Sequence, residues 1–534
     1  MGQSADYVVV GSGSAGSIIA RRLADSGAQV ILLEAGRKDN TQLIRKPGMV
    51  GALLVEPKLK AKIDWGHYTV EQKHALGRKI PQTHGKVLGG SSSINGMVFV
   101  RGNHKNFDDW AAEGNTGWSF QDVLPSFKKF ESFEDGASDY RGGSGPIKVI
   151  RARDLTPASE AFIEALATTT GTKKNPDYNG ADQEGVSLFQ QSAHNGLRFS
   201  TAVGYLDDRP ANLIVLHNTQ VGRVLIERGR ATGVEILTKN GREIIRATRE
   251  VIVSGGTFGS PHLLLLSGIG PADHVKAFGI DVHADLPVGE NLHDHMFVPM
   301  SFAMTSAIRK ASPAYFARAF IKEKLKNNST WLARSMFEVV AFVRTPYATA
   351  IPDLQLHVIP WSYPSPNQDA PVRHRADPRQ ALTIMSTLIY PKSRGTLRLT
   401  SADPTAAPAI DPNYLDEQAD IDVLVSGMEI IREAMAAREI SSGVSVEMEP
   451  GPSYPTRANL AKEILNRAST VYHPVGTCRM GVDERAVVDP QLRVRGIEGL
   501  RVADASIMPS IVGGNTNAAS MMIGEHAAAL ILAG

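Results

Sequence analysis

The stretch "DYVVVGSGSAGSIIARRLADSGAQVILLEAG" (residues 6–36) decides the fold class. Its opening "DYVVV" is a short apolar run of β-branched residues, typical of a parallel strand buried on both faces. A glycine-rich turn and an amphipathic helix follow, and "AQVILLEAG" predicts a second buried strand. A strand–helix–strand unit at this place predicts an α/β fold with a Rossmann-like nucleotide-binding domain.

The turn carries glycines in the spacing G-x-G-x-x-G, at Gly11, Gly13 and Gly16. The first glycine permits a tight turn, the second lets backbone approach a pyrophosphate, and the third allows close helix–strand packing. The helix that follows, next to Ser14, offers free N–H groups and a positive dipole end to phosphates. The pattern predicts a dinucleotide site, but it does not separate NAD from FAD.

Glu34 ends the second strand, 18 residues after Gly16. A carboxylate at this place can accept hydrogen bonds from ribose hydroxyls, and its negative charge disfavours a 2′-phosphate. We find no second glycine fingerprint that would indicate a nicotinamide partner. The distinction between NAD and FAD must therefore come from the residues that contact the redox ring.

The bulk properties exclude several classes of protein. A chain of 534 residues predicts two or more domains, and a net charge of +2 from 57 basic and 55 acidic residues does not favour a nucleic-acid partner. A single cysteine excludes an intrachain disulfide and favours a reducing compartment. We find no signal peptide and no apolar run of membrane-spanning length, so we expect a cytoplasmic protein.

The segment "HGKVLGGSSSINGMVFVRGNHKNFDDW" (residues 84–110) resembles the first signature of the glucose–methanol–choline (GMC) oxidoreductase family. "GGTFGSPHLLLLSGIG" (residues 255–270) is similar to the second signature, and "HPVGTCRMG" and "GLRVADASIMP" are similar to further family stretches. The similarity follows nearly the whole chain in order, closest to the bacterial choline-dehydrogenase-like and alcohol-dehydrogenase branch. It implies an FAD enzyme.

The resemblance also implies a domain organisation. We expect one discontinuous FAD-binding domain, with a lid-like loop at residues 51–83 inside it. We expect a substrate domain inserted into it, built on an antiparallel sheet covered by helices. The FAD-binding domain would comprise residues 1–150, 196–295 and 471–534, and the substrate domain residues 151–195 and 296–470.

Cofactor contacts follow from the matching positions in the family. The loop at residues 89–96 runs past the flavin in relatives, the backbone of Val221 matches a position beside adenine, and Asp504 one near the ribitol chain. Some relatives attach FAD covalently through a histidine in this loop, where this chain has Ile94, so we expect non-covalent FAD. The implied contacts beyond the glycine turn and Glu34 are Gly89, Gly90, Ser91, Asn95, Gly96, Val221, Asp504 and Asn517.

A histidine and the only cysteine of the chain lie close together in "VYHPVGTCRMG" (residues 471–481), at His473 and Cys478. A Cys/His hydrolase would need a thiol of lowered pKa and an oxyanion hole, for which the sequence offers no framework. A metal site would need three or four convergent ligands, and "HDH" (residues 293–295) supplies only two. A core histidine satisfied by a hydrogen bond is the third interpretation.

The resemblance favours a fourth interpretation. In the family the histidine of this stretch pairs with a later His or Asn, and both face flavin N5; Asn515, 42 residues after His473, matches the second position. His473 would then take the hydroxyl proton of an alcohol, and Asn515 would hold the alcohol oxygen. An imidazole of ordinary pKa, about 6.5, suits that task at neutral pH. Cys478 would be a small packing residue.

The implied activity is FAD-dependent oxidation of a primary alcohol to the aldehyde, or on to the acid, with hydride transfer to flavin N5. A hydroxynitrile lyase or photodecarboxylase on the same fold is the alternative, and the electron acceptor is O2 or a quinone. Aromatic residues for a choline cage exist at Trp65, Tyr68, Trp331 and Trp361, but we favour an uncharged, apolar or aromatic alcohol.

The basic, aromatic segment 308–328 has two interpretations. It is either a lid over the substrate entrance, which we favour, or a peripheral contact with the inner face of a membrane.

Overall fold

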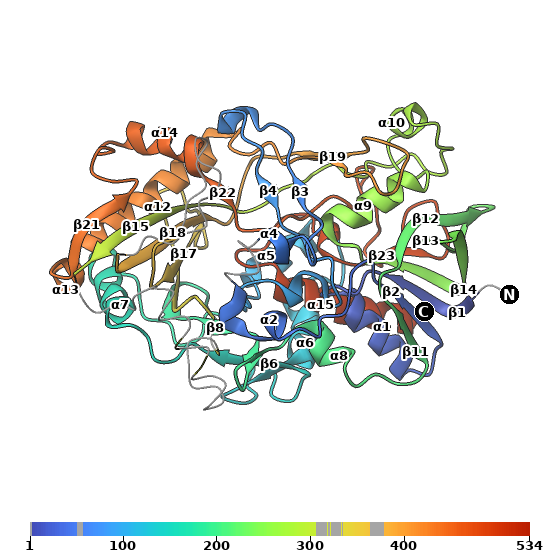
Figure 1. Cartoon of the computed structure of the whole chain (residues 1–534), viewed down its shortest axis with the longest axis horizontal. Helices are drawn as coiled ribbons and strands as arrows, with labels where there is room; N and C mark the ends of the chain where they lie inside the picture. Colours follow the sequence, from blue (N-terminus) through green and yellow to red (C-terminus); the bar gives the residue numbers. More distant parts are fainter. Residues whose placement is uncertain are drawn as a thin grey trace.

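The expected N-terminal unit is present as β1 (Gln3–Val10), α1 (Gly16–Asp25) and β2 (Val30–Leu33), with Val8, Val9 and all four residues of β2 buried. The structure, a computed structural model, describes residues 3–50, 57–305, 318, 321, 333, 335–363 and 379–534. The molecule is elongated, and a seven-stranded sheet lies toward each end (Figure 1). Both chain termini lie at the same end, beside the sheet that contains β1.

The first sheet combines a parallel part with an antiparallel extension. β14 is its longest strand, and it pairs in parallel with β1 and β23 and antiparallel with β13. The order across the sheet is β11–β2–β1–β14–β13–β12, with β23 also on β14. Beyond β1 and β2, its strands are β11 (Leu213–Leu216), β12 (Gln220–Glu227), β13 (Arg230–Thr238), β14 (Gly241–Val253) and β23 (Leu500–Val502).

The second sheet is antiparallel, with the order β21–β15–β18–β17–β16–β7 and β22 also paired with β15. Its central strands β15 to β18 are buried along their whole length. The strands are β7 (Gly185–Leu188), β15 (Met296–Met304), β16 (Val339–Val343), β17 (Leu354–Ile359), β18 (Ala381–Leu388), β21 (Val444–Glu449) and β22 (Ser469–Thr470). The predicted fold class, a Rossmann-like part joined to an antiparallel sheet with helices, is confirmed; the exact domain boundaries remain a prediction.

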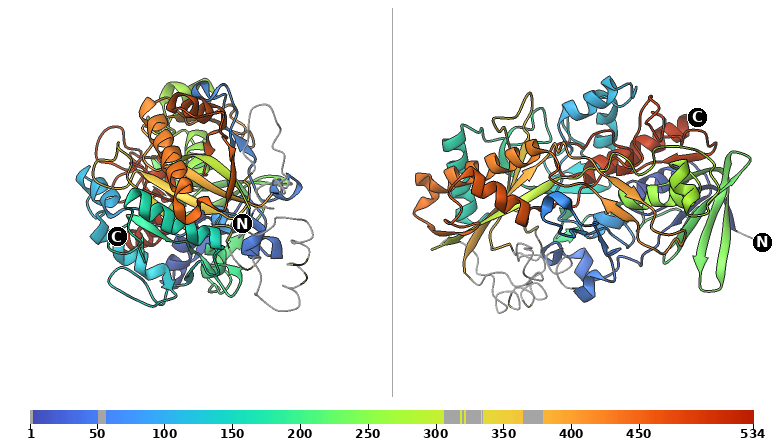
Figure 2. Two further views of the ribbon diagram at one scale, coloured as in Figure 1. Left: turned by 90° about the vertical axis from the view of Figure 1, so that its left-hand side faces the viewer. Right: turned by 90° about the horizontal axis from the view of Figure 1, so that it is seen from above.

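Helices pack on both sheets (Figures 1 and 2). α15 (Asn517–Ala533) lies against α1 and α6 in the first half, and α12 (Gln418–Ala436) lies against β18 and α7 in the second. The other α-helices of the described residues are α2 (Gln42–Arg45), α4 (Pro57–Lys60), α5 (His104–Ala112), α6 (Phe120–Phe130), α7 (Pro157–Thr170), α8 (Thr201–Tyr205), α9 (Gly256–Leu266), α10 (Ala272–Ala277), α13 (Arg438–Ser441) and α14 (Arg457–Arg467).

Short elements connect the two halves. Residues 57–83 of the expected lid-like loop contain α4 and the small hairpin of β3 and β4. The minor strands are β3 (His67–Tyr68), β4 (Pro81–Gln82), β5 (Glu131–Phe133), β6 (Ile147–Arg151), β8 (Gln190–Gln191), β9 (Ala193–His194), β10 (Leu197–Arg198), β19 (Thr396–Arg398) and β20 (Ala409–Asp411).

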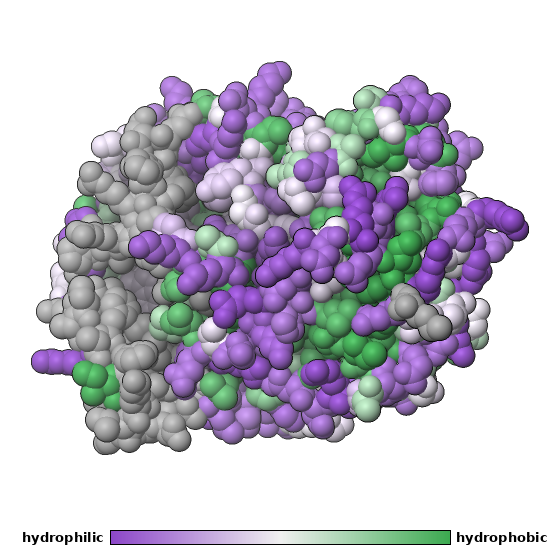
Figure 3. All heavy atoms as spheres, turned by 45° about the vertical axis from the view of Figure 1, so that its right-hand side comes forward, coloured by the Kyte–Doolittle hydropathy of each residue, from purple (hydrophilic) through white to green (hydrophobic). Residues whose placement is uncertain are grey.

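Hydrophilic residues cover most of the face shown in Figure 3, with apolar areas between them. Folded proteins normally expose some apolar surface, and Ile214 and Ile244 are among the exposed apolar residues of this protein. No helix in the described part of the chain is long and apolar enough to cross a membrane. The segment 308–328, expected as a lid or membrane contact, lies outside the described residues except for Arg318 and Ile321.

A buried network of ion pairs links residues from several segments of the chain. Glu131, fully buried at the start of β5, accepts hydrogen bonds from Arg101 at 2.5 Å and from Arg141 at 2.5 and 3.1 Å. Arg141 also donates to Asp177 at 2.6 Å and to Gln190 at 2.9 Å. Two buried guanidinium groups therefore share one carboxylate, and its removal would leave Arg101 without its carboxylate partner and Arg141 with Asp177 alone.

We expect Glu131→Gln to lower the free energy of unfolding by about 3–5 kcal/mol, because both arginines lose their shared anion. Asp109→Asn is the matched control, since Asp109 forms a half-exposed pair with Lys105 at 2.6 Å, and pairs of that kind contribute about 0.2–1 kcal/mol. Urea unfolding of the protein, followed by tryptophan fluorescence, measures both variants. Equal shifts in the two unfolding midpoints would contradict a stabilising role for the network.

Candidate functional site

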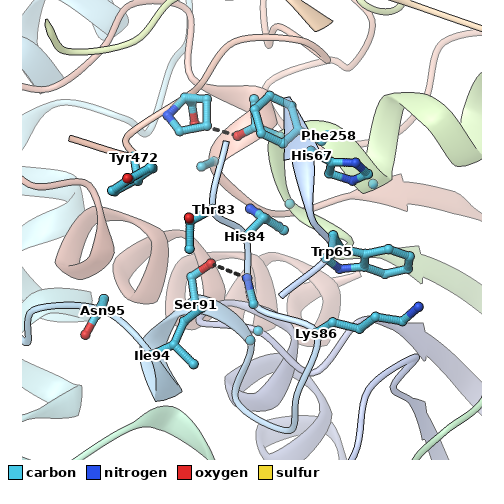
Figure 4. Close-up of a pocket in the computed structure, with 18 of the residues that line it drawn as sticks. Trp65, His67, Thr83, His84, Lys86, Ser91, Ile94, Asn95, Phe258 and Tyr472 are labelled. Carbon is cyan, nitrogen blue, oxygen red and sulfur yellow. Dashed lines mark hydrogen bonds between the residues drawn. The ribbon is translucent and has the colours of Figure 1, made fainter. Parts of the chain in front are cut away.

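A cavity of about 1540 Å³ lies where residues from both sheets meet (Figure 4). Strands β1, β2, β14 and β23 are parallel, so their carboxyl ends all lie on the same side of the first sheet. This side faces the cavity. The residues just beyond those ends, Gly11, Glu34, Ser254 and Asp504, line the cavity. The edge of the parallel sheet is therefore one wall of the site.

Three helices begin at this wall. α1, α9 and α15 start at Gly16, Gly256 and Asn517, and residues at or just before each start line the cavity. The Ser14 hydroxyl donates to Asn517 Oδ1 at 2.7 Å, which joins the starts of α1 and α15. Three sets of free N–H groups and positive dipole ends make this wall suited to the phosphates of a dinucleotide.

Two carboxylates stabilise the backbone of the wall. Glu34, whose pKa is raised by burial, accepts hydrogen bonds from the Ser12 N–H at 3.1 Å and from the Gly36 N–H at 2.7 Å. Asp504 accepts from the Gly256 N–H at 2.8 Å and from the Ser260 hydroxyl at 2.5 Å, and so fixes the start of α9. Both side chains line the cavity and are largely enclosed by protein.

The residues present fit FAD. A Cβ on Gly13 would meet no protein atom within 4 Å, so this position is open toward the cavity, whereas a Cβ on Gly16 would lie 2.0 Å from the Gly11 carbonyl oxygen. Arg198, buried beneath the loop at residues 89–96, donates to Asn95 Oδ1 at 2.9 Å, and its Nη2 has no hydrogen-bond partner. An anionic cofactor beside Asn95 would compensate that buried cation.

Most of the predicted contacts share this one cavity. Two do not line it: Gly16 packs against Gly11, and Gly89 (φ +86°) turns the chain behind the wall. Trp65, Tyr68 and Trp361 line the cavity, and Trp331 lies outside the described residues. The predicted residues that line it are Gly11, Gly13, Ser14, Glu34, Gly90, Ser91, Asn95, Gly96, Val221, His473, Asp504, Asn515 and Asn517.

His473 follows a tight turn that leaves β22. The Thr470 hydroxyl accepts from the Tyr472 N–H at 2.7 Å, and Tyr472 has φ +65°, which a bulky residue rarely adopts. Buried Asp294 holds this turn: its Oδ1 accepts from the His473 N–H at 2.9 Å, and its Oδ2 accepts from the hydroxyls of Thr470 and Tyr414. Burial raises the pKa of Asp294 to about 6.

The His473 side chain lies between two partners. Its Nε2 is 3.0 Å from Asn515 Nδ2, as expected for the predicted pair, and its Nδ1 is 3.1 Å from His295 Nδ1. Burial, together with nearby His295 and His357, holds the pKa of His473 well below the ordinary value of 6.5. The structure thus differs from the expectation of an ordinary imidazole pKa.

His295 was missed in the sequence as a neighbour of His473. Met296, the first residue of β15, pairs with β18 on one side and with β22 on the other. The residues just outside these pairs are therefore brought together beside Met296. Gln355 of β17 was missed as well, and its Nε2 donates to Asn515 Oδ1 at 3.1 Å. These contacts depend on the pairing of distant strands; the "HDH" motif was their only local signal.

Cys478 is fully buried and does not line the cavity. Its pKa is raised well above 9.0 by burial, so the thiolate that a Cys/His hydrolase requires is disfavoured. Within the described ranges, no group of three or more His, Cys, Asp and Glu side chains could hold a metal ion. The structure therefore supports neither a thiol catalyst nor a metal site in this part of the chain.

Beside His473 and Asn515 the cavity wall is apolar. Phe297, Met385 and Ile359 form a cluster with neighbouring aromatic and apolar side chains, most of which line the cavity. The neighbours are Met336, Phe337, Trp361, Tyr363 and Val471. In Figure 4, Trp65, His67 and Phe258 lie on one side of the pocket, and Tyr472 and Asn95 lie on the other.

Comparisons with known proteins place the chain in a family. The family model described as "GMC oxidoreductase" matches residues 5–297, and a second model of the same description matches residues 391–524. The chain is 39% identical to an oxygen-dependent choline dehydrogenase of Rhizobium etli and 38% identical to an alcohol dehydrogenase [acceptor] of Pseudomonas putida. Each alignment covers 99% of this chain and 95% of the relative.

A solved structure supports the same placement. A formate oxidase of Aspergillus oryzae, studied for the modification of its FAD, superposes with a TM-score of 0.89 at 27% identity. The superposition covers 100% of this chain and 98% of the formate oxidase. The predicted family and the predicted FAD cofactor are thereby confirmed. The chain belongs to the GMC oxidoreductase family, and it is an FAD-dependent enzyme that oxidises CH–OH donors.

Proposed function

We propose that the protein oxidises an uncharged, apolar or aromatic primary alcohol to the aldehyde, with His473 as the base and Asn515 as the group that holds the alcohol oxygen. The observation that carries the proposal is the pair itself. His473 Nε2 and Asn515 Nδ2 lie 3.0 Å apart on the cavity wall, next to an apolar cluster that a hydrocarbon substituent could fill.

The two side chains have complementary tasks. An alcohol becomes an aldehyde when its hydroxyl proton and a hydride of its carbinol carbon both leave, and His473 Nε2 is the acceptor for the proton. In the structure an amide N–H of Asn515 faces His473 Nε2. When the alcohol binds, its O–H would take the place of this contact at Nε2, and an Asn515 N–H can donate to the alcohol oxygen instead. The alcohol oxygen would then be held beside the base, which aligns the carbinol C–H bond.

FAD, when bound, supplies the hydride acceptor at flavin N5, chemistry that side chains lack. Gln355 donates to Asn515 Oδ1 and so holds the side chain of Asn515 in place, and the Asp294 network holds the turn that carries His473. We also propose that FAD is held without a covalent bond, since the buried Ile94 occupies the position where some relatives carry the attached histidine.

The charge of the cavity favours an uncharged substrate. Among the described residues that line it, the only carboxylates are Glu34 and Asp504, and both already bind backbone N–H groups. Trp65, a candidate for a choline cage, already has the Lys86 ammonium 4.2 Å from its ring centroid. A quaternary ammonium group would therefore find cationic competition at that ring and no available anion among these lining residues.

Replacement of the base tests the activity directly. We expect His473→Ala to keep its yellow cofactor while flavin reduction by alcohol slows by about 10²–10⁴-fold, because the hydroxyl proton loses its acceptor. Anaerobic stopped-flow measurement of flavin absorbance gives the rate. Cys478→Ala is the matched control from the same segment and should reduce flavin at nearly the wild-type rate. Normal reduction in His473→Ala would contradict the proposal.

The pH dependence follows from the lowered pKa of His473. A base works in its neutral form, and a pKa below 6.5 means that this form predominates at neutral pH and is lost as pH falls through the lowered pKa. We expect the rate of flavin reduction to stay flat from pH 8 to about 6.5 and to decline only in more acid solution. A decline that begins above pH 6.5 would contradict a buried, neutral base.

A panel of alcohols tests the substrate class. We expect benzyl and medium-chain aliphatic alcohols to bleach the flavin with a higher kcat/KM than choline, because an apolar cluster lies beside His473 and Asn515. 3,3-Dimethylbutan-1-ol, the uncharged isostere of choline, is the matched control and isolates the effect of the positive charge. A clear preference for choline over this isostere would overturn the assignment of an uncharged substrate.

A further inference from the structure

The "HDH" motif supplies a residue that no metal or hydrolase interpretation explains. His295 is fully buried directly before β15, and both of its ring nitrogens have partners. Its Nε2 lies 2.9 Å from the Ile389 carbonyl oxygen, and its Nδ1 lies 3.1 Å from His473 Nδ1. The two contacts have different chemical freedom, because a histidine nitrogen can donate or accept whereas a carbonyl oxygen can only accept.

The carbonyl therefore sets the direction of a chain of hydrogen bonds. His295 must carry its proton on Nε2 to donate to Ile389, which leaves a lone pair on Nδ1 of the neutral ring. That lone pair can only accept, so His473 must carry its own proton on Nδ1. The remaining nitrogen of His473, Nε2, is then unprotonated and faces the Asn515 amide.

The other end of this series of hydrogen bonds, at Asn515 and Gln355, cannot set the direction in which the protons are donated. Asn515 Oδ1 accepts from Gln355 Nε2 at 3.1 Å, but Gln355 Oε1 is buried without a hydrogen-bond partner. If both amides rotated by 180°, they would accept a proton on His473 Nε2 equally well. The contact of His295 Nε2 with the Ile389 carbonyl resists reversal, since a carbonyl oxygen cannot become a donor.

We propose that His295 is a positioning residue that fixes the tautomer of His473, so that the nitrogen facing the alcohol is the unprotonated one. The proposal rests on the assignment of His473 as the base. His295 itself touches neither alcohol nor cofactor; it acts through His473. Fixed tautomers are important for histidine bases because the wrong tautomer presents a donor where the reaction needs an acceptor.

The surroundings keep His295 neutral. Its pKa is lowered to about 3, chiefly by burial, and His357, across on β17, opposes a second positive charge. The neighbouring ionisable groups are His473, His357 and Asp294, and the Asp294 carboxylate binds Thr470, Tyr414 and the His473 N–H. A doubly protonated His295 would donate from Nδ1 to His473 and so reverse the direction of that hydrogen bond. Burial disfavours this charged state.

Two substitutions separate tautomer control from packing. Glutamine has an amide oxygen that can accept from His473 Nδ1 and an amide N–H that can donate to Ile389, whereas leucine has neither. We expect His295→Leu to slow anaerobic flavin reduction at pH 7 by about tenfold or more, and His295→Gln to recover most of that loss. FAD content and the unfolding midpoint of the holoenzyme control for damage to the fold.

A second readout does not depend on activity. In holoenzyme labelled with ¹⁵N-histidine, the His473 signals, identified by their loss in His473→Ala, should report protonated Nδ1 and bare Nε2. We expect His295→Leu to shift them toward a mixture of tautomers, and His295→Gln to restore the wild-type pattern. A wild-type signal from protonated Nε2 would overturn the proposal, as would equal slowing by both substitutions with an unchanged tautomer.

The design distinguishes this proposal from the proposed function. If His473→Ala reduces flavin normally, His473 is not the base and the proposed function fails, whatever the tautomer. If His473→Ala is slow but His295→Leu reduces flavin at the wild-type rate, the base assignment stands and the positioning role is wrong. In the His473→Ala background, His295→Leu should cause no further loss, because the ring that it orients is gone.

Discussion

The parallel pairing of β14 with β1 and β23 is the constraint on which the rest of the site depends. This register aligns Val10 with Val253 and Val253 with Val502, so the turns after three strands far apart in the sequence open at one edge. Gly11, Gly255 and Asp504 thereby become neighbours. Because the strands are parallel, their three loops and two of the following helix starts face one cavity, and a dinucleotide can bind main-chain N–H groups from all of them.

The antiparallel sheet contributes the chemistry by a similar constraint. β15 begins between β18 and β22, and its first residue, Met296, pairs with Leu388 on one side and Thr470 on the other. The residues just outside these pairs are therefore brought together, among them His295, Ile389 and His473. A shift of one residue in either pairing would turn these side chains to the opposite face and separate His473 from its partners. The position of the proposed base is thus a property of the sheet as well as of its own turn.

The difference between what could and could not be predicted follows from these two constraints. The glycine turn, Glu34 and the His473–Asn515 spacing are local or family patterns. The fold class, the cofactor wall and the pair of His473 with Asn515 could be predicted from them. The contact of His295 with His473 joins segments 178 residues apart and depends on strand register, which no local pattern encodes. The ordinary pKa expected for His473 failed for the same reason, since the burial and the two nearby histidines that lower it come from other strands.

The clustering of His295, His357 and His473 in a buried site has a further physical consequence. Each imidazole is neutral because burial disfavours its charged form, and the pKa of each is lowered. A proton taken by any one of them would raise the energy of charging the others, so the cluster can hold one proton more readily than two. A base in such surroundings would accept a proton only while the reaction supplies it and would return it readily afterwards. The same low proton affinity would keep His473, the proposed base, unprotonated before each turnover.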